Sequence, residues 1–242
     1  MKIAVATLAV GFRYQRAVRL GIKSKDHYCR RHGYEFIYRE VPFTDRAPSW
    51  DKIPLLSENI DRFEVIFWSD ADVVIVNSTR RLEDIIGMFA LGEDKAILIA
   101  RDSADNVNAG NFFLFNRPST QELLTKIWQQ DQFIHHVWLE NQAIIHLLES
   151  DPEFASAVHI EERNPNIFNA YCHVGDPVRN YRSGDLLLHF AGIRDPEKIE
   201  RMMKHHYLHT RKEFDLTRML LALNNCISIP LASLMRALQE KQ

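Results

Sequence analysis

The sequence contains few cysteines, and these follow no recognisable pattern. Only three occur among 242 residues (Cys29, Cys172 and Cys226), with neither a CxxC pair nor a metal-ligand spacing. An odd number of widely separated cysteines does not fit a small secreted fold stabilised by disulfides. The cysteine content therefore favours a reducing compartment.

Long apolar runs are also missing. The first ten residues, MKIAVATLAV, are apolar, but no small-residue cleavage pattern follows them, so they predict a buried strand rather than a signal peptide. Asn224, Asn225 and Pro230 interrupt the apolar stretch 220–235, which is shorter than the ~20 residues that a membrane span needs. We expect a cytoplasmic protein without a signal peptide or a transmembrane anchor.

The sequence lacks the excess of positive charge that is typical of proteins that bind nucleic acid. Thirty Lys and Arg residues are balanced by 32 Asp and Glu residues, which gives a formal net charge of −2. A nucleic-acid partner is therefore not expected. Hydrophobic residues make up 46% and charged residues 26%, which is ordinary for a globular protein and excludes the disordered and fibrous classes.

Apolar strands and helical patterns alternate along the chain, which predicts an α/β fold with a mixed, mostly parallel sheet flanked by helices. The β-branched run Lys2–Leu8 is typical of a strand buried on both faces, and a helix over Tyr14–Arg31 is expected to end at Gly33. No linker is apparent, so we expect one domain over residues 1–195 and a helical extension over 196–242. Further strands are expected at 34–38, 65–68, 95–100, 111–116 and 186–190, and further helices at 50–60, 81–89, 119–130, 138–148, 196–211 and 216–239.

Two carboxylates, Asp70 and Asp72, follow the apolar strand Val65–Trp68. Residues two apart on an extended backbone project the same way, so both carboxylates can reach one divalent cation. Ligands of open α/β sheets gather at this edge, and two like charges this close are costly to bury without a cation. The alternative interpretation is a solvated turn at the end of the strand.

Two enzyme classes place Asp-x-Asp after an apolar strand: phosphatases of the haloacid dehalogenase type and nucleotide-sugar glycosyltransferases. The phosphatase motif opens its domain and needs a late acidic pair, whereas here about 64 residues precede the strand and His189 stands where the last carboxylate should be. A histidine at this place is a suitable third ligand for Mn²⁺. Gly192 permits close backbone approach, and Arg194 can bind phosphate oxygens. A glycosyltransferase is favoured, with the phosphatase or a non-catalytic sugar-nucleotide-binding protein as the alternatives.

Five blocks of the sequence occur in an order that is more specific than any block alone. They are YCRRHGYEFIY (28–38), WDKIPL (50–55), FWSDADVVIVN (67–77), NAGNFFLFN (108–116) with ENQAI (140–144), and FNAY (168–171) leading into GDLLLHFAG (184–192). Together they resemble the glycosyltransferase family of the fungal galactosyl- and mannosyltransferases and the plant xyloglucan xylosyltransferases. The resemblance implies a GT-A fold, which is Rossmann-like, and bound Mn²⁺ or Mg²⁺. It also implies a UDP- or GDP-linked sugar donor, a glycan or lipid-linked saccharide acceptor, and transfer with retention of anomeric configuration.

The resemblance assigns the diphosphate and metal site to particular residues. Asp70 and Asp72 match the motif that binds metal and ribose, and Ala71 between them is expected to contact the donor. His189 matches a late metal ligand. Arg194, which follows Gly192 in the diphosphate segment, stands where relatives carry a lysine that contacts the leaving diphosphate.

The resemblance also implies contacts to the donor sugar. Asn108 and Gly110 match an Asn-x-Gly segment beside the sugar, and Gln142 matches a glutamine on the reactive face of the sugar. Relatives have an acidic residue directly before this glutamine, whereas this chain has Asn141 there and Glu140 one position earlier.

The expected mechanism follows from the charges. Bound metal and Arg194 would stabilise the charge that develops on the departing diphosphate. A neutral amide such as Gln142 is a poor covalent nucleophile, so front-face attack with the leaving phosphate as base is expected, and Glu140 is the nucleophile if a covalent intermediate forms. Asp185 could orient the acceptor hydroxyl, or it could be a carboxylate in a surface turn.

Position alone suggests the remaining candidates. Thr7, Leu8 and Ala9 end the first strand and are expected to offer backbone groups to the base and ribose, and Tyr14 is expected to stack on the base. Lys52 could reach a phosphate, or it could be structural.

The C-terminal region combines basic residues over 204–212 with an apolar stretch over 216–238. A basic amphipathic tail could make peripheral contact with the inner face of an anionic membrane that holds a lipid-linked acceptor. It could equally pack on the catalytic domain or on a second copy in a homodimer.

Overall fold

A six-stranded mixed sheet forms the centre of the molecule, with strand order β2-β1-β3-β6-β5-β7. The computed structural model describes residues 1–102, 104–172 and 179–207. Strand β6 runs antiparallel to its neighbours β3 and β5, and the other three pairs are parallel. The predicted α/β fold with a mostly parallel sheet is therefore confirmed. The strands are β1 (Ile3–Leu8), β2 (Glu35–Arg39), β3 (Val65–Ser69), β5 (Ile97–Arg101), β6 (Val107–Phe115) and β7 (Val158–Glu161).

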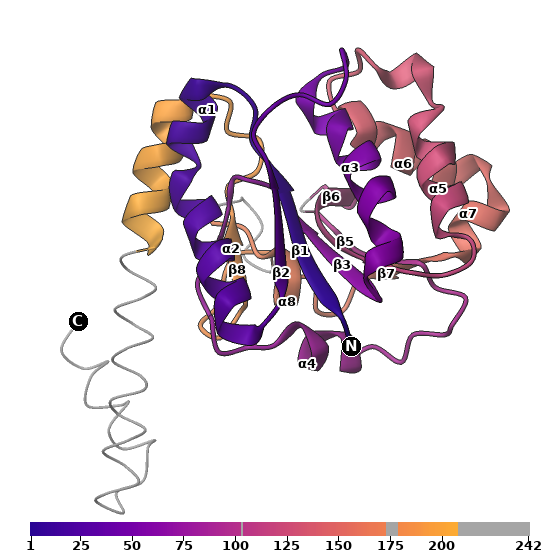
Figure 1. Ribbon diagram of the computed structural model, residues 1–242, viewed down its shortest axis with the longest axis horizontal. Coiled ribbons are helices and arrows are strands. Elements are labelled where there is room, and N and C mark those ends of the chain that lie inside the picture. Colours follow the sequence, from indigo (N-terminus) through magenta and orange to yellow (C-terminus); the bar gives the residue numbers. More distant parts are fainter. Residues whose placement is uncertain (103, 173–178, 208–242) are drawn as a thin grey trace, which may run out of the picture.

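Helices cover both faces of this sheet (Figure 1). Successive side chains of a strand point to opposite faces, so Ala6 and Trp68 pack under α3, α5 and α6, whereas Val5 and Phe67 pack under α2 and α4. The helices are α1 (Phe12–Ala17), α2 (Arg19–His32), α3 (Lys52–Asn59), α4 (Leu82–Gly87), α5 (Thr120–Trp128), α6 (Leu139–Ser150), α7 (Pro152–Ser156) and α8 (Asn166–Asn169), with short 3-10 turns at Pro48–Asp51, Ile60–Arg62 and Asp131–Phe133.

The helix predicted over 14–31 is divided into α1 and α2 at Val18, which is buried together with Val74 and Phe190. Its predicted end is confirmed, because Gly33 adopts a left-handed φ of 73° and its N–H donates to the carbonyl of Cys29. The sequence did not indicate β7, whose only four residues pair with β5 at the edge of the sheet.

A second, two-stranded sheet lies beside α2 and positions the Asp-x-Asp segment. It pairs β4 (Val73–Ile75) with β8 (Leu187–His189) in antiparallel orientation, and Val73 lies opposite His189. The strand predicted at 186–190 is confirmed as a strand, but it belongs to this small sheet. No separate sequence pattern indicated β4, which follows β3 after a turn of only three residues.

One face of α2 binds the backbone of β4. Lys25 Nζ donates to the Val73 carbonyl at 2.6 Å, and the Ile75 N–H donates to Ser24 Oγ at 3.0 Å. Gly21 allows the close approach, because a Cβ at that position would lie 2.4 Å from the Ala71 carbonyl oxygen. The three residues recur at helical spacing and hold the segment that carries Asp72 against the helix.

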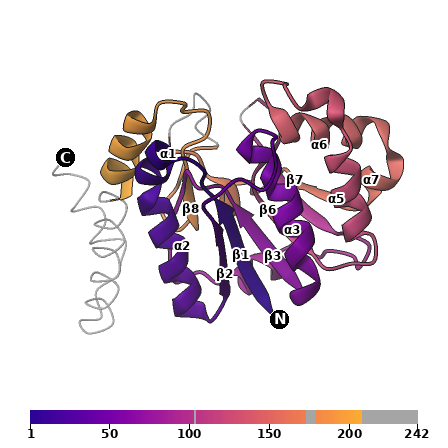
Figure 2. The ribbon, with the colours of Figure 1, turned by 45° about the horizontal axis from the view of Figure 1, so that its top comes forward.

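A helix over residues 196–207 lies alongside α1 and α2 (Figures 1 and 2). Its Ile199 and Met203 are buried in a cluster with Ala17 and Val18. The beginning of the predicted extension thus packs on the preceding part of the chain. The helix predicted over 216–239 lies outside the described residues, and the domain boundary at residue 195 stays a prediction. Within the described ranges, no helix combines the length and apolar character that a membrane span requires.

Candidate functional site

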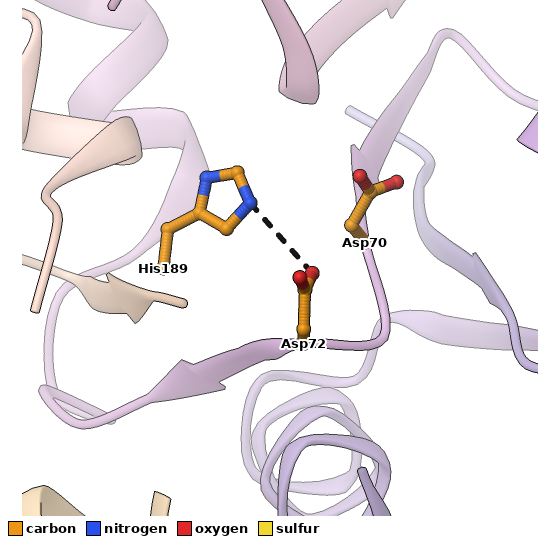
Figure 3. A group of neighbouring side chains, drawn as sticks. All are labelled: Asp70, Asp72 and His189. Carbon is orange, nitrogen blue, oxygen red and sulfur yellow. Dashed lines mark ion pairs between the residues drawn. The ribbon is translucent and has the colours of Figure 1, made fainter. Parts of the chain in front are cut away.

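Three potential metal ligands meet where the two sheets adjoin (Figure 3). Asp70 follows β3, Asp72 precedes β4, and His189 ends β8. One ligand atom from each residue lies within 4.8 Å of the others. The pairing of Val73 with His189 brings together residues that are more than a hundred positions apart in the sequence.

One oxygen of the Asp72 carboxylate lacks a hydrogen-bond donor among the described residues. This oxygen, Oδ1, is buried, and His189 Nε2 lies 3.6 Å away. Burial lowers the pKa of His189 although the charges of Asp72 and Asp70 oppose this shift. The imidazole is therefore neutral near pH 7, and the contact is not an ion pair. Two carboxylates and a neutral imidazole form a donor set that fits Mn²⁺, which would satisfy the orphaned oxygen.

Asp70 is oriented by neighbours on the protein side. Its Oδ1 accepts a hydrogen bond of 2.7 Å from Trp68 Nε1 and lies 3.4 Å from Lys52 Nζ. Its backbone N–H donates to the Gly110 carbonyl at 2.7 Å. These contacts occupy one carboxylate oxygen, and the second remains to bind a cation.

Lys52 lies in the wall of the site and is almost completely buried. Its Nζ is 2.8 Å from Glu140 Oε1 and donates to the Ala109 carbonyl at 2.9 Å. Burial acts to lower the pKa of Lys52, but the charges of Asp70 and Glu140 outweigh burial and raise this pKa above its usual value. Lys52 is therefore a fixed positive charge whose contacts join β6, α6 and the Asp-x-Asp segment. Its predicted contact with a phosphate stays a prediction.

A cavity of about 690 Å³ opens over the metal-ligand cluster. Its volume is within the range of small-molecule sites. Ten of the predicted site residues line it: Lys52, Asp70, Asp72, Asn108, Gly110, Glu140, Asn141, His189, Gly192 and Arg194.

Asn141, at a position where the family resemblance implies an acidic residue, links α6 to β6. Its Oδ1 accepts from the Ala109 N–H at 2.8 Å, and its Nδ2 donates to the Val107 carbonyl at 3.1 Å. The pairing of β5 with β6 shifts register beside this segment, between Ile99 and Ala100. Asn141 thus supports the irregular backbone that presents Asn108 and Gly110 to the cavity.

Several predicted residues lie outside the lining of the cavity. The backbone N–H of Ala9 donates to the Arg39 carbonyl, and the Ala9 carbonyl accepts from Gln15 Nε2. Asp185 accepts from the Arg182 N–H at 2.8 Å within a turn, so its carboxylate has the turn position that the sequence allowed as an alternative. The functional roles expected of these residues stay predictions. The predicted residues that lie outside the lining are Thr7, Leu8, Ala9, Tyr14, Ala71, Gln142 and Asp185.

Two apolar residues in the wall of the cavity were not among the site residues predicted from the sequence. Val137 and Trp138 line it and are 62% and 50% exposed, respectively. The next residue, Leu139, has a left-handed φ of 48°, a conformation that non-glycine residues seldom adopt outside functional sites. Periodicity cannot distinguish an exposed tryptophan at the start of a helix from a core tryptophan, and only the structure separates these cases.

The mixed sheet flanked by helices has the GT-A fold of nucleotide-sugar glycosyltransferases. A crystal structure of a glycosyltransferase involved in glycosylation of the major capsid of PBCV-1 superposes with a TM-score of 0.67 and 15% identity, covering 85% of this chain and 100% of that one. The bifunctional glycosyltransferase WbbM, in its apo form, matches with a TM-score of 0.56 and 12% identity over 90% of this chain and 51% of its own. At these identities the likeness establishes the fold.

The chain belongs to the galactosyl transferase GMA12/MNN10 family, whose model matches residues 13–89 and 88–200. An uncharacterized alpha-1,2-galactosyltransferase of Schizosaccharomyces pombe, C1289.13c, is 27% identical over 214 residues, which cover 72% of this chain and 56% of that protein. An alpha-1,2-galactosyltransferase of the same yeast is 24% identical, with coverage of 71% and 55%. The chain thus spans little more than half the length of these curated relatives. Family membership favours the glycosyltransferase over both alternatives raised by the sequence.

Proposed function

We propose that this protein is a metal-dependent, retaining glycosyltransferase. It would move galactose from a UDP- or GDP-linked donor to a hydroxyl group of a glycan or lipid-linked saccharide. The family and the names of the yeast relatives support galactosyl transfer. The observation that carries the proposal is the buried Asp72 Oδ1, which accepts no hydrogen bond from the part of the chain that the structure describes and faces a neutral His189 in a cavity of about 690 Å³.

Asp70, Asp72 and His189 would hold Mn²⁺ or Mg²⁺, which when bound supplies a Lewis acid for the diphosphate of the donor. Arg194 lies exposed in the lining of the same cavity, where its guanidinium can bind phosphate oxygens. Both features stabilise negative charge that grows as the glycosidic bond breaks, which accelerates the reaction.

The proposed route is front-face attack of the acceptor hydroxyl, with the leaving phosphate as base. Glu140 is buried, and its Oε1 is 2.8 Å from Lys52 Nζ. Pairing with a cation lowers the nucleophilicity of this carboxylate, which argues against a covalent intermediate on Glu140. Gln142, two residues further along α6, is proposed to act on the charge that develops at the sugar.

Trp138 is proposed to bind the acceptor. Its indole is half exposed in the cavity wall, and the edge of His136 packs against it at a centroid distance of 5.8 Å. A rigid aromatic face with a wet edge suits the apolar face of a saccharide ring, because it contributes contact area at little conformational cost.

A panel of nucleotide sugars with and without Mn²⁺ tests the proposal, read as donor hydrolysis and as transfer to saccharide acceptors. We expect turnover with a galactose donor that depends on Mn²⁺ and preserves the anomeric configuration, checked by NMR of the product. Asp72→Asn should abolish this turnover. Asp102→Asn is the matched control, because Asp102 lines the same cavity but uses its Oδ1 on the N–H groups of Ala104 and Asn106.

Equal activity in metal chelator, or in Asp72→Asn, would refute metal dependence. Cleavage of phosphomonoesters without transfer would favour the phosphatase, and donor binding without turnover would favour a non-catalytic protein. The cytoplasmic location and the contact of the C-terminal region with a membrane or a second copy remain predictions, to be tested by cell fractionation and solution mass.

A further inference from the structure

The metal-ligand candidate His189 is held from behind by a buried asparagine. His189 Nδ1 lies 2.9 Å from Asn169 Oδ1, and both side chains are almost fully buried. Tyr171 stacks on the imidazole at a centroid distance of 5.4 Å and an interplanar angle of 18°. Asn169 ends the short helix α8 and reaches His189 across the junction of the two sheets.

The same amide reaches the Asn-x-Gly segment of β6. Asn169 Nδ2 lies 3.3 Å from Asn108 Oδ1 and 3.3 Å from the hydroxyl of Tyr171. Asn108 Oδ1 in turn accepts a hydrogen bond of 3.1 Å from the backbone N–H of Gly110. A continuous chain of hydrogen bonds therefore runs from a backbone amide to the imidazole.

Only one assignment of donors and acceptors satisfies this chain. A backbone N–H can only donate, so the atom of Asn108 beside Gly110 is the oxygen. The other orientation of Asn169 would place its amide oxygen 3.3 Å from this oxygen, a contact between two acceptors, so the nitrogen of the Asn169 amide faces Asn108 and its oxygen faces His189. An amide oxygen cannot donate, so Nδ1 of His189 carries the proton.

We infer that Asn169 is a positioning residue that fixes the Nδ1–H tautomer of His189. The Gly110 N–H, which can only donate, sets the direction of the hydrogen bonds in this chain. In this assignment Asn111 Nδ2 also donates to Asn169 Oδ1, at 2.9 Å. The contact of Asn111 Nδ2 with His189 Nδ1, at 3.4 Å, is then a contact between two donors rather than a hydrogen bond.

The tautomer decides whether the site can bind a cation. With the proton on Nδ1, Nε2 presents its lone pair toward the space that it shares with Asp72 Oδ1, 3.6 Å away. With the proton on Nε2, an N–H instead of a lone pair would point into that space, and Nε2 could not ligate a cation. Partners of this kind, placed behind a ligand, orient the ring and typically change metal affinity about 10- to 100-fold when removed. This consequence rests on the proposed function, whereas the tautomer itself does not.

Long-range ¹H–¹⁵N spectra of the metal-free protein, labelled in histidine, measure the tautomer directly. We expect His189, identified by the signal that His189→Gln removes, to show a protonated Nδ1 and an unprotonated Nε2. Asn169→Ala should move the signals toward the other tautomer, while Asn169→Asp, which retains an acceptor, should not. Asn166→Ala is the matched control, because Asn166 lies in the same helix but donates to the Asn180 carbonyl.

Binding of Mn²⁺, followed by electron paramagnetic resonance, supplies the second measurement. Asn169→Ala should weaken binding about 10- to 100-fold, with Asn169→Asp and Asn166→Ala within a few-fold of the parent. If Asn169→Ala does not fold, the pair Asn108→Ala and Asn108→Asp replaces it, because only the aspartate retains an acceptor for Gly110 and Asn169.

A protonated Nε2 in the parent protein would overturn the inference. An unchanged tautomer in Asn169→Ala and in Asn108→Ala would overturn it as well. If the parent protein shows the expected tautomer but does not bind Mn²⁺, the proposed function is refuted and the inference about the tautomer stands.

Discussion

Lys25 donates a hydrogen bond of 2.6 Å from its Nζ to the backbone carbonyl of Val73, directly after the Asp-x-Asp motif. The side chain is fully buried, and no carboxylate of the described residues forms an ion pair with it. Burial lowers the pKa of Lys25 to about 7, although the charges of Asp72 and Asp70 act to raise it. A lysine therefore supports the metal-ligand segment while carrying little charge above neutral pH.

The lowered pKa of Lys25 predicts a pH-dependent stability. Between pH 7 and its normal pKa near 10.5, the unfolded chain binds a proton that the folded chain does not, so stability rises with pH across this window. Relative to Lys25→Met, the parent should gain up to about 1.4 kcal/mol of unfolding free energy per pH unit. Urea denaturation of metal-free protein at several pH values measures the difference.

The control for this experiment is Lys23→Met, an exposed position on the same helix. Its difference from the parent should stay flat with pH. A flat difference for Lys25→Met as well would mean that Lys25 is charged in the folded protein.

Gly110 cannot accept a side chain without displacing His189. A Cβ at this position would lie 2.3 Å from His189 Cε1 and 2.9 Å from Asn108 Oδ1. Gly110→Ala should weaken Mn²⁺ binding at least about tenfold, with a loss of stability of about 1–3 kcal/mol from overpacking. Calorimetric titration with Mn²⁺ and urea denaturation provide the two values. Gly87→Ala serves as the control, because no atom lies within 4 Å of its added Cβ, and full Mn²⁺ affinity in Gly110→Ala would contradict the described packing.

Trp138→Ala should raise the acceptor KM about tenfold, because about 1.4 kcal/mol of stacking and burial would be lost. The donor KM and the rate of donor hydrolysis should stay close to the parent values, since the proposed contact is with the acceptor. Steady-state kinetics with each substrate varied in turn separate the two effects, and Trp138→Phe should restore much of the affinity. Phe12→Ala, at an 81% exposed aromatic outside this cavity, is the control. A change confined to the donor KM would move Trp138 to the donor side.

The sequence predicts those parts of the fold and site that depend on local pattern. Apolar runs identified β1 and β3, and Gly33 marked the end of α2, since each signal acts within a few residues. The order of the motif blocks indicated that Asp70, Asp72 and His189 act together. Their meeting, however, depends on the pairing of β4 with β8, which a three-residue strand does not announce in its sequence.

What the sequence could not give are relationships across the fold. Asn169 appears in the sequence only as one letter of the FNAY block, and its role depends on the amide of Asn108, 61 positions earlier. Lys25 reads as one more basic residue of an amphipathic helix, yet it is fully buried against β4. Trp138 is half exposed directly before the left-handed turn at Leu139. Long-range polar partners and loop conformations leave no periodic signal, so the structure is needed to see them.

Arg194 provides the sharpest test of leaving-group stabilisation. Its side chain lines the cavity from the segment after Gly192, at a position where the family resemblance implies a lysine. Arg194→Lys should keep much of the activity, because the charge remains although bidentate geometry is lost. Arg194→Ala should lower kcat by about two to four orders of magnitude, because a charge donor is most valuable when the diphosphate departs.

The control for Arg194 is Arg201→Ala, an exposed arginine on the following helix that lies outside the cavity lining. Its kcat should match that of the parent. Rates at saturating Mn²⁺ and donor distinguish the cases, because saturation removes any difference in binding and leaves the step in which charge develops. If the lysine and alanine variants at position 194 turn over equally fast, Arg194 does not contact the leaving diphosphate, and the metal ion alone must carry its charge.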